Sequence, residues 1–242
     1  MYKSEFVKEN GYYMGRVVAI GGGELDTTHG INKYIVELAD KKNPNLLFIG
    51  TASHDAEGYI SAIRTEFESL GCVVRALCLT MTAYKNEEID GILNQADIIY
   101  VGGGDTRTMM ETWKQYSLDK KLKGIYEKDT AVLAGLSAGA ICWFRSGHSD
   151  SDSFNCGEEW KFIILDGMLG LYPYCFCPHY NEEGRETFDL MISDIDYDGL
   201  ALENDTAFVE AAGKQFIIGA RKDAKAWLFN EHNKQELEVI SC

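Results

Sequence analysis

The chain has 242 residues, with 23 Lys and Arg against 38 Asp and Glu and a formal net charge of −15. This balance argues against a nucleic-acid partner, because binding a phosphate backbone needs clustered Lys and Arg to displace counterions. No apolar run approaches the roughly 18 residues that span a bilayer, and residues 1–10 lack the apolar segment of a signal peptide. We therefore expect a cytoplasmic protein with no nucleic-acid and no membrane partner.

Composition also predicts one α/β domain over residues 1–242. Only three prolines occur, and no low-complexity stretch, internal repeat or linker-like shift in composition divides the chain. The cysteines are odd in number, mostly in apolar contexts and without paired C-x-x-C spacing, so we expect reduced core thiols. They are Cys72, Cys78, Cys142, Cys156, Cys175, Cys177 and Cys242.

The first half of the chain alternates short apolar runs that end in glycine with segments of helical periodicity. This alternation predicts a mostly parallel sheet with helices on both faces. The predicted strands are 16–20, 46–49, 72–79, 97–101 and 131–134, and the predicted helices are 31–38, 58–70 and 108–116. Ligands of such sheets bind outside the carboxyl ends of the strands, so the site is expected there.

The second half of the chain is more strand-like and predicts additional C-terminal strands. The candidates are 174–178, 200–203, 207–210, 215–218 and 226–229.

The segment Gly135-Leu-Ser-Ala-Gly139 carries the main chemical signal. It matches G-x-S-x-G, directly after the apolar run 130–134 and directly before the segment 140–144, which we interpret as a helix. A strand, a sharp turn and a helix in this order present a serine Oγ at the edge of the sheet, and the flanking glycines remove Cβ atoms that would collide with backbone. Ser137 is therefore predicted to be a nucleophile.

Two glycine-rich loops follow predicted strands. The first, 21–23, is not a dinucleotide fingerprint, because G-x-G-x-x-G would need glycine at position 26, where the chain has Asp26; we interpret it as a tight turn. The second, 102–106, lies where backbone N–H groups could stabilise an oxyanion. We predict that Gly103 and Gly104 do so together with the N–H of Ala138.

Five histidines are candidates for a general base. His148 and His232 lie in polar segments that suggest exposed loops, while His29 and His54 follow glycine-ended strands and could either line the cleft or lie at the surface. His179 closes the apolar segment 174–178, where a base could meet a nucleophile from a neighbouring strand, and it is the predicted base.

A histidine base needs an acceptor at its second ring nitrogen, and the turn after strand 200–203 offers Glu203, Asn204 and Asp205. Alternation along an extended chain puts the two carboxylates on one side and the amide on the other, and the sequence does not choose between them. Cys175, Cys177 and His179 share one strand face, yet no second Cys/His cluster has zinc-ligand spacing, so no metal is predicted.

With Gly102-Gly-Gly-Asp-Thr106, Gly135-Leu-Ser-Ala-Gly139 and Pro178-His-Tyr180 in this order, the chain resembles the peptidase E group of serine peptidases, whose relatives include cyanophycinase. The resemblance implies a flavodoxin-like fold similar to class I glutamine amidotransferases, with Ser137 as nucleophile and His179 as base. The third family position, normally a carboxylate, aligns best with Asn204. Either Asn204 orients His179 as an amide, or Glu203 or Asp205 does so after a small register shift.

The resemblance implies a serine exopeptidase that cleaves after an N-terminal aspartate and needs no cofactor. The alternatives are a cyanophycinase-like β-aspartyl peptidase, an amidase such as a glutaminase, and a ligand-binding module on the same fold. An aspartate substrate needs a cation, and Arg107 is the first candidate, with Asp105 and Thr106 as neighbouring substrate-binding residues; Arg145 and Arg185 are the other cations considered. A homodimer is left open.

Overall fold

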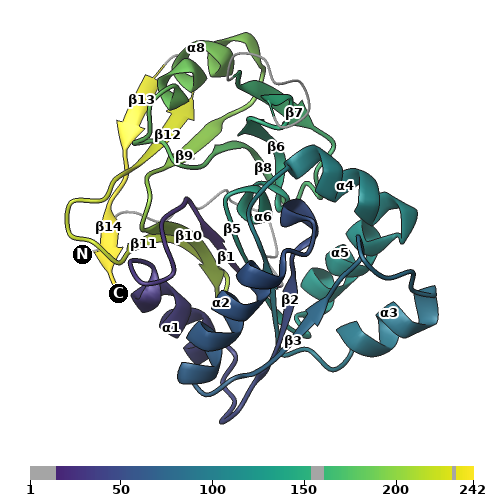
Figure 1. Cartoon of the computed structure of the whole chain (residues 1–242). Helices are drawn as coiled ribbons and strands as arrows, with labels where there is room; N and C mark the ends of the chain where they lie inside the picture. Colours follow the sequence, from purple (N-terminus) through teal and green to yellow (C-terminus); the bar gives the residue numbers. More distant parts are fainter. Residues whose placement is uncertain (1–14, 154–160, 231–232) are drawn as a thin grey trace.

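The computed structural model describes residues 15–153, 161–230 and 233–242, so Cys156, His232 and residues 1–10 lie outside the described chain. Within these ranges the strands form two sheets, which lie one above the other in Figure 1. The strand order is β14-β11-β10-β1-β5-β4-β2-β3 in the larger sheet, sheet A, and β13-β12-β9-β8-β6-β7 in the smaller one, sheet B. No helix in the described ranges is long and apolar enough to cross a membrane.

Sheet A confirms the predicted mostly parallel sheet. Its strands are β1 (Arg16–Ile20), β2 (Asn45–Ile49), β3 (Val73–Leu77), β4 (Ile98–Val101), β5 (Val132–Leu136), β10 (Thr206–Ala211), β11 (Lys214–Gly219) and β14 (Val239–Ser241). The first five pair in parallel, β10 is antiparallel to β1 and to β11, and β14 is parallel to β11. The central strands are buried on both faces, which explains why they appear as continuous apolar runs.

Helices cover both faces of sheet A (Figure 1). On one face Ile31 of α1 and Phe67 of α2 belong to the same buried cluster as Val18 of β1; on the other, Trp113 of α4 belongs to the cluster that contains Leu133 of β5. The helical segments are α1 (His29–Leu38), η1 (Thr51–Ser53), α2 (Glu57–Ser69), α3 (Asn86–Leu93), α4 (Thr106–Gln115), α5 (Leu118–Lys128), α6 (Ala138–Ile141), η2 (Arg185–Thr187), α8 (Phe188–Met191) and η3 (Ile192–Asp194).

Sheet B was not expected as a separate sheet. Its strands are β6 (Phe144–Ser149), β7 (Ile163–Asp166), β8 (Tyr172–Cys177), β9 (Gly199–Leu202), β12 (Ala226–Asn230) and β13 (Asn233–Glu236). Aromatic side chains join it to sheet A, because the Phe208 ring of β10 lies 5.7 Å from Phe144 and 4.8 Å from Tyr172, measured between centroids. The helix expected over 140–144 is wrong: α6 ends at Ile141, and Phe144 opens β6.

Candidate active site

The carboxyl end of β1 holds the three loops that form the candidate site. The carbonyls of residues 20, 21 and 22 accept hydrogen bonds, in that order, from the backbone N–H groups of Ser137 (3.1 Å), His179 (2.8 Å) and Asp205 (2.9 Å). The loops that follow β5, β8 and β9 therefore meet on three consecutive peptide units. Gly21 and Gly22, in a loop interpreted from the sequence only as a tight turn, thus anchor the loops of His179 and Asp205, and the preceding Ile20 anchors that of Ser137.

Glycine at position 22 is required by this convergence. A Cβ there would lie 2.1 Å from Asn204 Oδ1 and 2.3 Å from His179 Nδ1, and the residue has φ of +155°. Any side chain at this position would displace the Asn204 amide and the His179 ring.

Ser137 lies in a strained turn between β5 and α6, with φ 56° and ψ −115°. The turn is tight enough that a Cβ on Gly135 would lie 2.2 Å from the carbonyl oxygen of Gly139, and a Cβ on Gly139 would lie 2.2 Å from that of Val101. Ser137 Oγ makes no hydrogen bond to any described residue. This half-buried serine on a strand-to-helix turn has the backbone geometry expected of the predicted nucleophile.

His179 follows the end of β8 in a left-handed conformation, with φ of 54°. Its Nδ1 lies 2.8 Å from Asn204 Oδ1 and 3.1 Å from Glu182 Oε1, so a proton on this nitrogen has two acceptors. Its Nε2 has no hydrogen-bond partner among the described residues. The arrangement fixes Nδ1 as a donor and leaves Nε2 as the basic nitrogen.

The alternatives at positions 203–205 are separated by the structure, which brings only Asn204 against His179. Glu203 Oε2 accepts the backbone N–H of Lys225 at 3.0 Å and lies 3.7 Å from the Arg221 guanidinium. Asp205 Oδ1 accepts from Thr27 Oγ1 at 2.5 Å, and its Oδ2 lies 3.4 Å from Arg221 Nε. Both carboxylates therefore serve other partners.

Sequence reasoning missed Glu182. Its backbone N–H donates to the carbonyl of His179 at 2.8 Å, and this turn brings the carboxylate back to the imidazole and to Asn204 Nδ2, which donates to Glu182 Oε1 at 2.9 Å. The hydrogen bond from His179, supported by that from Asn204 and by the charge of Arg185, outweighs partial burial and lowers the pKa of Glu182 to about 2. The available signal was an acidic residue three positions after the candidate base.

The predicted oxyanion donors lie on both sides of Ser137. A Cβ on Gly103 would lie 3.3 Å from Ser137 Cβ, so this part of the loop after β4 runs beside the serine. Ala138 opens α6, where a backbone N–H has no partner within the helix. Gly104 has a different constraint, because its φ is +134° and a Cβ would lie 2.2 Å from the Ala52 carbonyl.

Tyr59 is a second residue that sequence reasoning did not identify. Its hydroxyl lies 3.3 Å from the Gly103 backbone nitrogen and accepts from it. Burial raises the pKa of Tyr59, so the group is a neutral phenol next to the loop that is expected to bind an oxyanion.

Two of the three predicted substrate-binding residues, Asp105 and Thr106, are buried at the start of α4. Asp105 is 2% exposed and is the N-cap of α4: its Oδ1 accepts the backbone N–H of Arg107 at 2.9 Å, and its Oδ2 accepts from Thr108 Oγ1 at 2.6 Å. Thr106 is buried in the first turn of the same helix. The Arg107 guanidinium is partly exposed and forms an ion pair with Asp152 at 2.7 Å.

The other two cations also have partners. Arg145 lies over the ring of Tyr197, 3.8 Å from its centroid. Arg185 is buried and donates to the carbonyl of His148 at 2.8 Å. His148 itself corrects the sequence interpretation, because it is fully buried in β6 rather than in an exposed loop, and burial together with the nearby charge of Arg185 lowers its pKa to about 3.

The remaining chemistry-bearing candidates lie away from Ser137. His29 is half-exposed and bonds Glu66 at 2.9 Å, and His54 is exposed. Cys175 and Cys177 are fully buried in sheet B. In the described ranges, no group of three or more His, Cys, Asp and Glu side chains is placed to hold a metal ion.

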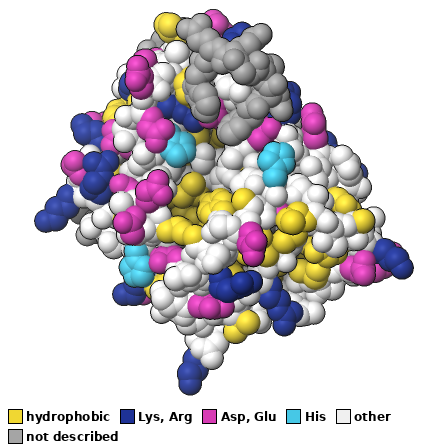
Figure 2. All heavy atoms as spheres, viewed as in Figure 1, with side chains coloured by type: hydrophobic (Ala, Val, Ile, Leu, Met, Phe, Trp, Pro, Cys, Tyr) yellow, Lys and Arg dark blue, Asp and Glu magenta, His cyan; other side chains and the backbone are white. Residues whose placement is uncertain are grey.

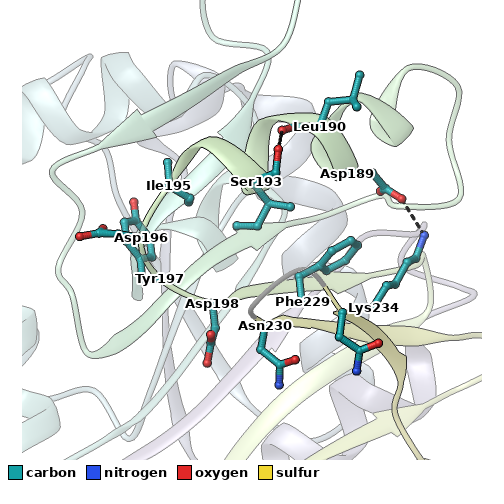
Figure 3. Close-up of a pocket in the computed structure, with 12 residues that line it drawn as sticks. Asp189, Leu190, Ser193, Ile195, Asp196, Tyr197, Asp198, Phe229, Asn230 and Lys234 are labelled. Carbon is teal, nitrogen blue, oxygen red and sulfur yellow. Dashed lines mark hydrogen bonds and ion pairs between the residues drawn. The ribbon is translucent and has the colours of Figure 1, made fainter.

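A pocket of about 620 Å³ lies apart from these groups, between the 189–198 segment and the β12–β13 hairpin (Figure 3). Asp189, Tyr197, Phe229 and Lys234 are among its lining residues, and Lys234 Nζ pairs with Asp189 Oδ2 at 3.0 Å. Neither Ser137 nor His179 lines it. The pocket is therefore separate from the candidate site formed around Ser137 and His179.

Comparison with known proteins decides the class of this site. The model of peptidase family S51 matches residues 17–218, a range that contains Ser137, His179 and Asn204. The chain belongs to peptidase family S51. This S51 peptidase is 31% identical over 236 residues to YgaJ of Bacillus subtilis (strain 168), described as an uncharacterized peptidase, with 93% of this chain and 97% of YgaJ covered.

Two solved structures share the fold of this S51 peptidase. A peptidase from an acI-B1 actinobacterium superposes with a TM-score of 0.71 at 23% identity, covering 95% of this chain and 96% of the other. A Listeria monocytogenes EGD-e protein, described provisionally as peptidase E, gives a TM-score of 0.65 at 20% identity, covering 84% and 98%. The family, the flavodoxin-like fold and the serine peptidase class predicted from the sequence are therefore confirmed.

Proposed function

We propose that this S51 peptidase is an exopeptidase that hydrolyses dipeptides or short peptides with an N-terminal aspartate through an acyl-enzyme at Ser137. The observation that carries the proposal is the attachment of Ser137 and His179 to adjacent carbonyls of β1, at residues 20 and 21. This attachment supports the proposal because it brings the loops that carry Ser137 and His179 to one edge of sheet A.

The mechanism follows from the roles that the geometry allows. Ser137 Oγ attacks the carbonyl carbon after the aspartyl residue, and His179 Nε2 accepts its proton. Asn204 Oδ1 accepts from Nδ1–H and holds the imidazole in the required tautomer, as the amide does in Cys-His-Asn enzymes. The imidazolium then protonates the leaving amine. In the second half of the reaction His179 accepts a proton from the attacking water and returns it to Ser137 Oγ as the acyl group leaves.

The oxyanion formed in both steps needs backbone donors. In this proposal the N–H groups of Ala138 and Gly103 supply them, and each donor contributes about 3 to 4 kcal/mol of transition-state stabilisation. The Gly103 N–H exchanges the Tyr59 hydroxyl for the oxyanion when substrate binds.

Arg107 is the proposed partner of the substrate aspartate. It follows the loop that passes beside Ser137, and 38% of its side chain is exposed against 6% for Arg185. Arg145 is 53% exposed, but it lies over the ring of Tyr197 in sheet B. The substrate carboxylate replaces Asp152 in a bidentate pair with the guanidinium.

The test compares hydrolysis of Asp-Leu, Ala-Leu and glutamine by the wild type and Ser137→Ala, with Ser69→Ala as a control at an exposed serine of α2. We expect cleavage of Asp-Leu well above the other two, a loss of at least a thousandfold in Ser137→Ala and no change in Ser69→Ala. Wild-type enzyme that leaves Asp-Leu intact defeats the proposal. Release of ammonia from glutamine would instead support the amidase. Release of β-Asp-Arg dipeptides from the polymer that cyanophycinases cleave would support the cyanophycinase-like enzyme, and binding without turnover would support the binding module.

A further inference from the structure

Asn204 stands where the family pattern has a carboxylate, and a neutral amide cannot supply the negative charge that stabilises an imidazolium. We propose that Glu182 is a positioning residue that supplies this charge, acting on His179 both directly and through the amide of Asn204. The inference rests on the proposed Ser137–His179 mechanism and adds to it a residue that neither the motifs nor the family comparison indicated.

Glu182 determines the orientation of the Asn204 amide. An ionised carboxylate only accepts hydrogen bonds, so the atom of Asn204 that lies 2.9 Å from Glu182 Oε1 is its Nδ2 donor. The amide oxygen must then face the other way, toward His179 Nδ1 at 2.8 Å. Glu182 thereby makes Nδ1 the protonated nitrogen and Nε2 the free base.

Glu182 also places a negative charge beside the imidazole. Glu182 Oε1 itself lies 3.1 Å from His179 Nδ1, so the carboxylate faces the nitrogen that carries the proton throughout the reaction. The other acidic groups near this loop, Glu203 and Asp205, are turned toward Arg221. Among the described carboxylates, Glu182 is thus the one in contact with the imidazole.

The Glu182 carboxylate must also be held in place, because half of its side chain is exposed and an exposed, mobile charge has little effect. The 179–182 turn is tied to the 204 loop twice: Asn181 Oδ1 accepts the backbone N–H of Asn204 at 2.8 Å, and Asn204 Nδ2 bonds Glu182. Arg185, on the buried side of the turn, adds a positive charge that favours the ionised form of Glu182. The carboxylate is held in place rather than free in solvent.

The decisive variant is Glu182→Gln, with Glu183→Gln as the control, because Glu183 is the adjacent exposed glutamate. The rate of Asp-Leu hydrolysis and its pH profile are measured for both. A second readout needs no peptide substrate: the rate at which phenylmethylsulfonyl fluoride labels Ser137 as a function of pH, located by mass spectrometry.

We expect Glu182→Gln to lower kcat about tenfold with little change in KM, and Glu183→Gln to match the wild type. Removal of a carboxylate destabilises the imidazolium, so the acidic limbs of the hydrolysis and labelling profiles should move to lower pH in Glu182→Gln. A purely structural role would lower activity without moving either limb.

The double variant Glu182→Gln/Asn204→Asp exchanges the amide and the carboxylate between the two positions. It restores one negative charge beside Nδ1, and we expect it to recover most of the activity that Glu182→Gln loses. No recovery, or a Glu182→Gln profile equal to that of Glu183→Gln, overturns the role of Glu182 while the hydrolase assignment stands. Wild-type enzyme that neither cleaves Asp-Leu nor labels at Ser137 overturns both, whereas labelling without cleavage overturns only the substrate, and the labelling profiles then decide the role of Glu182.

Discussion

The proposed nucleophile and the proposed base of this site are held by different means. Ser137 is fixed by backbone, in a turn where the close neighbours of Gly135 and Gly139 are carbonyl oxygens. His179 is fixed at its ring by the side chains of Asn204 and Glu182. The comparison shows that the serine half of the site is defined by steric exclusion at two glycines, and the histidine half by side-chain hydrogen bonds to residues three and 25 positions later in the chain.

The largest expected effect comes from Gly139→Ala, which breaks the backbone half. The new Cβ would lie 2.2 Å from the Val101 carbonyl, which belongs to a central strand and has little room to move. We expect a loss of about 3 kcal/mol or more in the free energy of unfolding, or no folded protein. Gly124→Ala is the control: it lies in α5 with no heavy atom within 4 Å of its Cβ, and urea unfolding should show it stabilised by about 0.5 to 1 kcal/mol. Equal stability of the two variants would contradict this account of the turn.

Gly22→Ala tests the side-chain half. Here the colliding atoms are His179 Nδ1 and Asn204 Oδ1, which can move aside, although φ of +155° also disfavours alanine. We expect kcat to fall about a hundredfold or more, with a loss of stability of about 1 to 3 kcal/mol. Kinetics and urea unfolding on the same preparation separate the two effects. A large loss of stability with a normal kcat per folded molecule would contradict the expected displacement of His179 and Asn204.

The smallest expected effect concerns pH and sheet B, whose core contains His148. Its pKa is lowered to about 3 in the folded protein, below about 6.5 in an unfolded chain, so the unfolded state takes up protons first as pH falls. Stability should therefore be full above about pH 6.5 and decline toward pH 3, by about 2 kcal/mol between pH 7 and pH 5.

His148→Phe keeps a ring beside Phe162 and Phe188 and should flatten this decline, whatever its effect at neutral pH. His29→Gln, at a half-exposed histidine, should leave the slope almost unchanged. Urea unfolding at both pH values measures it, and a slope in His148→Phe equal to that of the wild type would show that another group dominates.

The sequence was informative where local sterics decide the structure. Buried parallel strands appear as apolar runs, and the turn at Ser137 requires glycine on both sides, so the parallel strands of sheet A and the strand-to-helix turn at Ser137 could be predicted. Helices on both faces of sheet A were also predicted, because segments of helical periodicity alternate with the apolar runs; α1 and α2 cover one face and α4 the other.

Features that depend on pairing between distant segments could not be predicted in this way. The apolar runs of β9 and β12 look like those of β10 and β11, yet the first two belong to sheet B and the last two to sheet A. His148 lies in the polar segment 146–150, and its burial depends on Phe162, Phe188 and Arg185, which come later in the chain. The role proposed for Glu182 likewise depends on its hydrogen bond to Asn204, which lies 22 residues later in the chain.

Acidic side chains border the hydrophobic centre of the face in Figure 2, in keeping with the net charge of −15. An anionic peptide approaching such a face is repelled over distances of up to about a Debye length, roughly 10 Å at 0.1 M salt. The proposed preference for aspartate would thus depend on a local cation acting against the overall field.

The end of β1 also has a mechanical consequence. Because the backbone carbonyls of residues 20 and 21 each accept a hydrogen bond from one partner of the proposed proton transfer, the end of one strand positions both. A displacement of this strand end would therefore move the backbones of Ser137 and His179 together rather than apart.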